Sequence, residues 1–364
     1  MDYNLPRKVD VMRILIYSDI HIHKHKRDSE RLLDCLKVQE WVFQTAHERN
    51  IQNIFFCGDL FHERQIIDVE TYQKTFEIFE KYDKFNVYLL LGNHDMYHKK
   101  LWNISSMMPL QVIPGVTIIN NPCTLDIGDY SLSFLPYTDN PIGDLRELKN
   151  KSKFKVLFSH LALDNAILNK FANNFSVESV ERDGDMVKVD TDILQGWDQV
   201  FLGHYHYAQE LNEHVEYVGS PLQLSFGEAF SEKHIIEYDL ESHEKNYIEN
   251  TFSPKHYILK SDELDNYDLE NNFVRMYTDD LTSTDIAEIR NSIIEDKHVN
   301  SIEVLSTPGK SNKNEIMDAK TVLNRQGDMI EQYVEVEKSA GRINDNLDLQ
   351  LLIDIGKKIL ERNS

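Results

Sequence analysis

The stretch Arg13–His21, RILIYSDIH, joins an apolar, strand-forming run to an aspartate and a histidine two positions apart. A strand that is apolar at every position, instead of every second one, is typical of a sheet buried on both faces. In α/β proteins with such sheets, ligands bind outside the carboxyl ends of the strands. We therefore expect Asp19 and His21 to lie at a functional edge of a buried sheet.

Four more apolar runs end in the same way, in short clusters of polar residues. The runs are Asn53–Cys57, Asn86–Leu91, Phe154–Phe158 and Gln199–Leu202. The metal-binding residue types that follow them are Asp59, Asn93, His94, His160, His204 and His206. An isolated histidine is usually a satisfied core or surface residue, but eight such side chains at five strand ends predict one shared site.

Helical patterns separate these runs. A helix predicted within residues 29–50 has a narrow apolar stripe, and a second begins at the cap-like Asp68 and runs to about Asp83. Residues 115–136 and 215–240 have the pattern of short strands joined by turns. The sequence thus predicts an α/β fold, a two-sheet sandwich flanked by helices.

The composition changes after about residue 250, where the clusters of histidine and aspartate stop. We expect a core domain over residues 12–250, a small α/β domain over residues 255–308 and a helical segment over residues 315–364. The last predicted helix places Leu351, Leu352, Ile355 and Ile359 on one side. Such a terminal amphipathic helix either folds back on its own domain or docks on a partner. Met12 is a credible alternative start to Met1.

The composition also bounds the class of protein. With 41% hydrophobic and 27% charged residues, the chain resembles soluble globular proteins. It has no apolar secretory segment in its first 30 residues and no run of about 18 apolar residues, so we expect a cytoplasmic protein without a membrane anchor. Three widely spaced cysteines argue against a disulfide framework and a structural zinc site.

The charge restricts how this protein could bind nucleic acid. With 39 basic and 61 acidic residues, the formal net charge is −22, which repels a polyanion at long range. Near the predicted site, the basic clusters are residues 24–27 and Lys99–Lys100. Isolated charge runs of this kind are more often solvated surface. A nucleic-acid substrate would therefore have to be held locally or with the help of a partner.

The eight clustered residues offer enough oxygen and nitrogen ligands for two divalent cations. A carboxylate such as Asp59 can bridge two cations about 3.5–4 Å apart, which together activate water and neutralise charge on a phosphoryl group. Histidine-rich ligation favours manganese, iron or zinc over magnesium, which prefers oxygen ligands. Two Mn²⁺ ions are the first choice, with Fe or Zn possible and Mg²⁺ weaker.

Five short motifs carry a family resemblance: SDIH, GDLFHER, LGNHD, FSH and GHYH, in this order. They resemble the D-x-H, G-D, G-N-H-D/E, H and G-H-x-H motifs of the calcineurin-like metallophosphoesterases. The Phe61–His62 extension of the second motif and the string Gly219–Glu228 resemble the nuclease subunit of the SbcCD and MRN double-strand-break repair complexes, including its phage recombination-endonuclease relatives. The resemblance covers residues 12–230; beyond residue 250 only element order and size resemble that family's capping domain and partner-binding helices.

The resemblance implies a role for each residue of the site. One metal would be held by Asp19, His21, Asp59 and His206, and the other by Asp59, Asn93, His160 and His204. His94 would protonate the leaving 3′ oxygen, with Asp95 orienting its ring. His62 would line the DNA side of the site, although a surface position at a helix start is an alternative.

One stretch departs from the family pattern. Where many relatives carry a glycine, this chain has His23, followed by Lys24 and His25. Contact with phosphate and simple exposure both remain open for these three residues.

The resemblance further implies a manganese-dependent DNA nuclease. It would act as a 3′–5′ exonuclease on duplex ends and as an endonuclease on single strands and hairpins. The family's enzyme is a homodimer bound to a coiled-coil ABC-type ATPase of the SMC kind, which the C-terminal helices would contact. Such a partner would supply the basic surface that dominates DNA affinity.

Two other functions fit the same ligands. A phosphatase or small-nucleotide phosphodiesterase of the same superfamily would use the same metal pair, and activity on p-nitrophenyl phosphate without activity on duplex DNA would favour it. A degenerate, non-enzymatic scaffold for an ATPase is the third interpretation. It would require that the protein bind no metal at saturating manganese.

Overall fold

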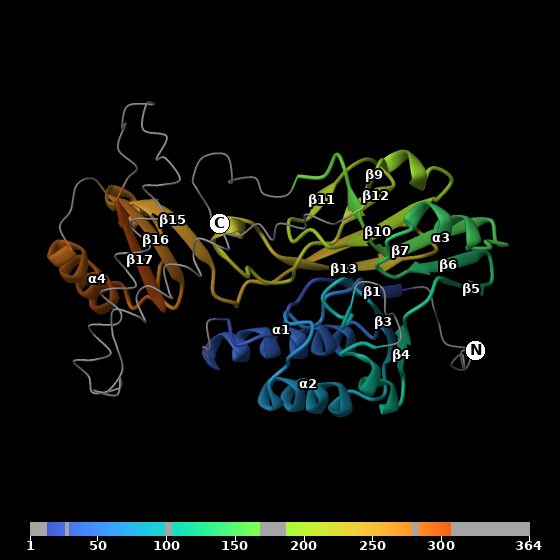
Figure 1. Cartoon of the computed structure of the whole chain (residues 1–364), viewed down its shortest axis with the longest axis horizontal. Helices are drawn as coiled ribbons and strands as arrows, with labels where there is room; N and C mark the ends of the chain where they lie inside the picture. The colour runs from blue at the N-terminus through green and yellow to red at the C-terminus, as the bar shows by residue number, and fades with distance from the viewer. Residues whose placement is uncertain (1–12, 26–28, 99–103, 168–186, 279–282, 307–364) are drawn as a thin grey trace, which may run out of the picture. The chain divides into compact units, whose positions relative to one another are not determined.

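The computed structural model describes residues 13–25, 29–98, 104–167, 187–278 and 283–306 (Figure 1). Their helices are α1 (Ser29–Glu48), α2 (Val69–Lys81), α3 (Pro141–Glu147) and α4 (Ser283–Lys297). Short 3₁₀ helices span η1 (Met108–Val112), η2 (Thr191–Leu194), η3 (Phe226–Glu228) and η4 (Ser261–Asn266). The predicted helices within 29–50 and 68–83 correspond to α1 and α2, and Asp68 caps α2 by accepting from the Thr71 N–H.

The first large sheet has six strands in the order β14-β13-β1-β2-β3-β4. These strands span β14 (Lys245–Glu249), β13 (His234–Asp239), β1 (Arg13–Tyr17), β2 (Asn53–Phe56), β3 (Asn86–Leu90) and β4 (Val116–Ile119). β1 to β4 run parallel, and β13 is antiparallel to β1. The apolar runs predicted from Arg13, Asn53 and Asn86 therefore form neighbouring strands.

The second large sheet also has six strands, in the order β11-β12-β10-β7-β6-β5. They span β11 (Gln209–Glu210), β12 (Val215–Tyr217), β10 (Gln199–Gly203), β7 (Phe154–His160), β6 (Tyr130–Leu135) and β5 (Cys123–Ile127). The four central strands run parallel, and both edge strands are antiparallel to their neighbours. β8 (Ala162–Leu163) and β9 (Lys188–Val189) form a separate two-stranded ladder.

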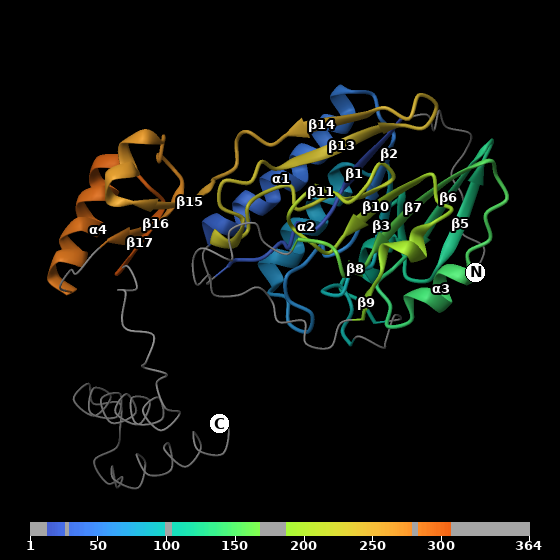
Figure 2. The ribbon, with the colours of Figure 1, turned by 90° about the horizontal axis from the view of Figure 1, so that it is seen from above.

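Apolar residues from both sheets pack together into one core. Phe55 of the first sheet stacks on Phe158 of the second, with ring centroids 4.8 Å apart. The other face of the first sheet packs on α1 and α2 in a second apolar cluster, which contains Leu15, Phe43 and Phe79. Figures 1 and 2 show the two helices on this face of β1–β4. The predicted two-sheet sandwich flanked by helices is confirmed.

Beyond residue 255 the described chain forms a small third sheet in the order β15-β16-β17. Its elements are β15 (His256–Lys260), β16 (Phe273–Thr278) and β17 (Ser301–Ser306), with α4 between the last two strands. Leu259, Val274, Met276 and Ile302 share an apolar cluster with Ile293 of α4. The division into domains at 250–255 stays a prediction, and the predicted helical segment 315–364 lies outside the described residues.

No helix in the described part of the chain combines the length and the apolar character that are needed to cross a membrane.

Candidate metal centre

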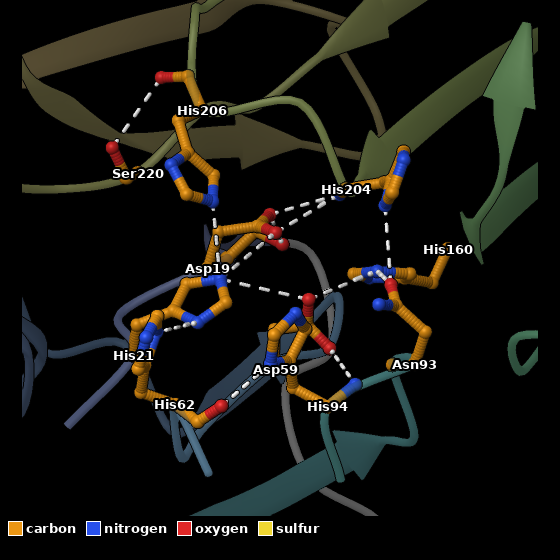
Figure 3. Close-up of polar contacts among 12 residues, drawn as sticks. Asp19, His21, Asp59, His62, Asn93, His94, His160, His204, His206 and Ser220 are labelled. Atoms are coloured by element: carbon orange, nitrogen blue, oxygen red, sulfur yellow. Dashed lines mark hydrogen bonds and ion pairs between the residues drawn. The ribbon is translucent and has the colours of Figure 1, made fainter. Parts of the chain in front are cut away.

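The residues predicted to bind metal lie together at the carboxyl ends of β1, β2, β3, β7 and β10 (Figure 3). Parallel pairing brings the strand ends to the same level, since Tyr17 is paired with Phe56, and His160 with Gly203. The first three strands belong to one sheet and the last two to the other. The site is therefore assembled from both sheets of the sandwich.

Four of these residues have a left-handed backbone conformation. The angle φ is 52° at Asp19, 47° at His21, 64° at Asp59 and 102° at His204. Residues other than glycine rarely adopt it, and it costs on the order of 1–3 kcal/mol at each position. Backbone hydrogen bonds hold two of the turns, from the Asp19 N–H to the Gly58 carbonyl (2.9 Å) and from the His21 N–H to the Asp59 carbonyl (3.1 Å). Strain of this kind concentrates at functional sites.

Two glycines permit the strand ends to approach this closely. A Cβ atom on Gly92 would overlap the Asp59 carboxylate, and one on Gly58 would overlap Nδ1 of His160. Gly58 also has a φ of +105°, which glycine adopts without a steric penalty. The glycines of the GDLFHER and LGNHD motifs thus make room for neighbouring ligand side chains.

The first ligand cluster consists of Asp19, His21 and His206. Nε2 of His206 lies 3.0 Å from Nε2 of His21. Nε2 of His21 lies 4.0 Å from Oδ1 of Asp19 and 3.6 Å from Oδ2 of Asp59. The donor atoms of three strand-end loops therefore point at one small volume.

The second cluster consists of Asp59, His160 and His204, joined by the Asn93 amide. Nε2 of His160 lies 3.3 Å from Oδ2 of Asp59 and 2.9 Å from Oδ1 of Asn93. Nδ1 of His204 lies 3.1 Å from the same Asn93 oxygen. Because Oδ2 of Asp59 faces both His21 and His160, this carboxylate is common to the two clusters.

The donor atoms fit a pair of cations. Ligand atoms at adjacent corners of an octahedron, each about 2.1 Å from the ion, are about 3 Å apart. The spacing of 3.0 Å between the His21 and His206 nitrogens and of 2.9–3.1 Å around the Asn93 oxygen matches this value. The buried Nδ2 atom of Asn93 has no hydrogen-bond partner among the described residues. The contacts that orient this amide are therefore those of its oxygen atom.

Outer hydrogen bonds set which nitrogen of each imidazole is free to bind a cation. Nδ1 of His160 lies 2.8 Å from the Cys57 carbonyl, and Nδ1 of His206 lies 3.1 Å from Oε1 of Glu228. A carbonyl and a carboxylate can only accept, so both Nδ1 atoms carry the proton. In the neutral form of each imidazole, the lone pair of Nε2 then faces the ligand clusters, as metal-binding histidines require.

Burial and neighbouring charges shift the pKa values in the site. Burial raises the pKa of Asp59, but His160 and His94 beside it lower it well below its usual value. Burial lowers the pKa of His160, but the Asp59 and Asp19 carboxylates raise it to about 9. Positive charge is thus stabilised between the two carboxylates, which is the electrostatic environment that a divalent cation needs.

His94 lies beside the clusters, and its contacts differ from the expectation. Its Nδ1 donates to the His62 carbonyl at 2.5 Å, and its backbone N–H donates to Oδ1 of Asp59 at 2.8 Å. The Asp95 carboxylate, expected to orient the His94 ring, instead accepts from the backbone N–H groups of Asp59 (2.7 Å), Leu60 (2.9 Å) and Gly92 (2.8 Å). Asp95 therefore fixes the loop that carries Asp59, and the His62 carbonyl orients the ring.

His62 and the unusual histidines that follow His21 gather on one side of the site. Nδ1 of His62 lies 3.3 Å from Nδ1 of His21, and the rings of His23 and His25 lie 5.2 and 5.4 Å from the His62 ring. Lys24 forms ion pairs with Asp68 (2.9 Å) and Glu70 (2.8 Å). Its charge is therefore already balanced by α2 and its cap.

The structure adds residues for which no motif predicted a role. Glu228 and Lys233 form a buried ion pair behind His206, with Nζ and Oε2 2.5 Å apart. Burial raises the pKa of Glu228, but the Lys233 ammonium and His206 lower it far below its usual value. Glu228 ends the Gly219–Glu228 string, whereas the stretch around Lys233 has no feature that marks a buried lysine.

A match to a protein family agrees with this geometry. Residues 12–218 match the calcineurin-like phosphoesterase family. The comparison with curated proteins gives no match. Among solved structures, the chain is similar to Yfce, a phosphoesterase from E. coli, with a TM-score of 0.31 and 13% sequence identity over 65% of this chain and 98% of that chain.

Proposed function

Because the chain belongs to the calcineurin-like phosphoesterase family, we propose that it is a manganese-dependent DNA nuclease. It hydrolyses phosphodiester bonds as a 3′–5′ exonuclease on duplex ends and as an endonuclease on single strands and hairpins. Phosphoester hydrolysis with a dinuclear metal site follows from the family. The choice of DNA and of manganese is our proposal.

One observation carries the hydrolytic part of this function: two donor clusters share Oδ2 of Asp59, which lies 3.6 Å from His21 Nε2 and 3.3 Å from His160 Nε2. Asp19, His21, Asp59 and His206 would hold one Mn²⁺ ion, and Asp59, Asn93, His160 and His204 the other. Such a pair supplies an activated water and neutralises charge on the phosphoryl group. Imidazole-rich ligation supports manganese over magnesium.

The remaining chemistry belongs to His94. Hydrolysis forms a bond from a water oxygen to phosphorus and breaks the bond from phosphorus to the 3′ oxygen, which must gain a proton as it leaves. Nδ1 of His94 is engaged with the His62 carbonyl at 2.5 Å. Nε2 is therefore the atom that delivers the proton to the leaving oxygen, as a general acid positioned beside the metal ligands.

Three features support DNA over a small substrate. They are His62 beside the site, the Gly219–Glu228 string behind His206, and the small sheet β15–β17 with α4. The elements of this small sheet follow the same order as in the capping domain of the nuclease family that the sequence resembles. Neither His62 nor the small sheet is one of the residues assigned to hold the metal pair. We take residues 255–308 as a capping domain that contacts DNA.

The net charge supports a partner that supplies basic surface. A chain of net charge −22 repels DNA, and Lys24, one of the basic residues close to the site, is neutralised by Asp68 and Glu70. We propose that the protein works as a homodimer with a coiled-coil ATPase of the SMC kind, which residues 315–364 contact and which supplies the basic surface. Deleting residues 343–364 should abolish co-purification with the ATPase while sparing cleavage of short single strands.

A nuclease assay on end-labelled duplex DNA tests the proposal. Release of mononucleotides from the 3′ end is expected with Mn²⁺, more slowly with Mg²⁺, and should be compared with and without a coiled-coil ATPase of the SMC kind. Asp59→Asn should abolish the activity, and His214→Asn, a change at an exposed loop histidine, should leave it intact. Hydrolysis of p-nitrophenyl phosphate without any cleavage of DNA would overturn the nuclease in favour of a phosphatase.

A further inference from the structure

A buried polar cluster of Ser220, Glu228 and Lys233 lies directly behind His206. Their side chains are almost inaccessible to solvent, with exposed fractions of 1%, 9% and 6%. Charged side chains are rarely buried this deeply unless they are paired. Figure 3 shows the His206 and Ser220 end of this cluster, on the side of His206 away from Asp59.

Glu228 fixes the side chain of His206. Its Oε1 lies 3.1 Å from Nδ1 of His206 and, as a carboxylate oxygen, can only accept the proton there. Nε2 of His206, 3.0 Å from Nε2 of His21, is left with its lone pair toward the first ligand cluster. Glu228 thus selects both the ring orientation and the tautomer that can bind a cation.

The same cluster fixes the backbone of His206. Its carbonyl accepts from the Ser220 N–H at 3.1 Å and from Nζ of Lys233 at 2.9 Å. His206 is therefore held at its ring and at its carbonyl by groups that are connected to one another.

Lys233 keeps Glu228 in place. Its ammonium has three N–H groups and three acceptors: the His206 carbonyl, Oγ of Ser220 (2.8 Å) and Oε2 of Glu228 (2.5 Å). Oγ of Ser220 lies 2.9 Å from the same Glu228 oxygen. The unit is hydrogen-bonded throughout, so neither oxygen of Glu228 lacks a donor.

Stability alone does not account for such a unit. Well-packed apolar side chains usually stabilise a fold as well as, or better than, a buried ion pair of the same volume. A specific geometric task, by contrast, requires charged groups at fixed positions. The groups here converge on a single residue, His206.

We propose that Glu228 is a positioning residue for the metal ligand His206, with Lys233 and Ser220 as its supports. The inference rests on the proposed two-metal function and adds to it a determinant of affinity at one of the two sites. The first cluster depends on Glu228, because it contains His206. The second cluster, Asp59, Asn93, His160 and His204, does not.

Glu228→Gln tests the proposal with little change of shape. The carbonyl oxygen of the new amide should remain with the donor Lys233, so its NH₂ group faces Nδ1 of His206 and favours the tautomer with the proton on Nε2. Glu216→Gln is a matched control, since Glu216 is 2% exposed and pairs with Lys245 at 2.6 Å, and none of its contacts in the described structure is with a predicted ligand. Circular dichroism establishes that both variants are folded.

The readout is manganese binding. Calorimetric titration of metal-free protein should give two Mn²⁺ ions for wild type and Glu216→Gln, whereas Glu228→Gln should bind one of the two about 10- to 100-fold more weakly. Electron paramagnetic resonance at one to two equivalents should show a spin-coupled Mn²⁺ pair in wild type and isolated Mn²⁺ in Glu228→Gln. A purely structural role would not remove the coupled signal selectively.

A double-mutant cycle tests whether Glu228 acts through His206. In a His206→Ala background, Glu228→Gln should cause no further loss of manganese affinity, because the ring that it orients is gone. Additive losses would show an effect independent of His206 and would overturn the proposal. If Glu228→Gln does not fold, Ser220→Ala tests the proposal in its place. We expect this variant to bind manganese at the same site roughly 2- to 10-fold more weakly.

The failures of the two proposals are distinguishable. Wild type that binds two Mn²⁺ ions and cleaves DNA, together with Glu228→Gln of unchanged affinity, overturns the role of Glu228 and leaves the function intact. Wild type that binds no manganese overturns both.

Discussion

At the scale of single residues, the site depends on side chains that the backbone holds in strained positions. Asp19, His21, Asp59 and His204 all have positive φ values. Asp95 contributes without belonging to either ligand cluster, since its carboxylate accepts three backbone N–H groups around Asp59 and Gly92. Burial, and then the nearby Asp59 carboxylate, raise the pKa of Asp95 to about 7. Hydrogen bonds of the surrounding backbone thus fix the geometry of the ligand side chains.

Gly92→Ala tests how closely the loops must approach. The new Cβ would overlap Oδ1 of Asp59 and displace the carboxylate whose other oxygen, Oδ2, both clusters share. We therefore expect loss of the coupled Mn²⁺ pair and a destabilisation of about 1–3 kcal/mol. Gly143→Ala in α3 is the control, because its Cβ would meet only the flexible side chain of Asn140, the N-cap residue of this helix. Urea unfolding and manganese titration measure both effects. A Gly92→Ala protein with wild-type manganese binding would contradict the role of this glycine.

His94→Asn tests the general acid. Both metals should still bind, because His94 is not assigned to either cluster, but turnover on DNA should fall about 10²–10⁴-fold when the proton donor is lost. The measurement is kcat at saturating Mn²⁺, with manganese stoichiometry determined in parallel. Turnover equal to that of wild type would remove His94 from the mechanism.

At the scale of elements, the loops that carry the ligands are anchored by the ends of helices and strands. Asp68 caps α2 by accepting from the Thr71 N–H at 3.2 Å and also pairs with Lys24, which lies three residues after His21. One side chain therefore ties the start of α2 to the loop after β1.

Asp68→Ala should destabilise the protein by about 1 kcal/mol through loss of the helix cap. Glu70→Gln is the control that removes an ion pair with Lys24 and leaves the helix cap in place, since Glu70 pairs with Lys24 but does not cap the helix. We expect its unfolding midpoint to stay close to that of wild type, because exposed ion pairs contribute little. Equal shifts of the urea midpoint in the two variants would show that Lys24, and not the cap, is responsible.

At the scale of the whole molecule, the small sheet contacts the segment that carries Glu228. The His256 ring of β15 lies 4.9 Å from the rings of both Phe226 and Phe273, and its backbone N–H donates to Gln223. Burial, and then the nearby Arg31, lower the pKa of His256 to about 3. The folded protein thus keeps a neutral imidazole at this contact.

This burial makes stability depend on pH. Between pH 6.5 and about 3 the unfolded chain protonates His256 whereas the folded protein does not, so stability is complete above pH 6.5 and falls as the pH falls. At pH 5 the loss due to this residue is about 2 kcal/mol. Between pH 7.5 and pH 5, the His256→Phe protein should lose correspondingly less stability than wild type. Urea unfolding at the two pH values measures the loss in each protein. Identical losses in the two proteins would exclude His256 as the origin.

Much of the site could be predicted from the sequence because its signals are local. Runs such as Arg13–Tyr17 are apolar at every position, and the polar residues that follow them mark the strand ends, so both the α/β sandwich and the eight clustered residues could be predicted. Residues that are close together within a motif are also close together in the fold. The residues of each loop were therefore placed correctly relative to their own strand.

Contacts between segments distant in the chain were decided only by the tertiary structure. Asp95 was expected to orient the adjacent His94, yet it accepts from the loop of Asp59, and the His62 carbonyl takes that role. Lys233 looks like an ordinary surface lysine in the sequence but lies buried against Glu228 and His206. Hydrogen-bond partners depend on which strands pair and on the backbone angles at their ends, and a local pattern carries no information about either. The sequence alone determined which residues could bind metal, and folding determined how each one is held.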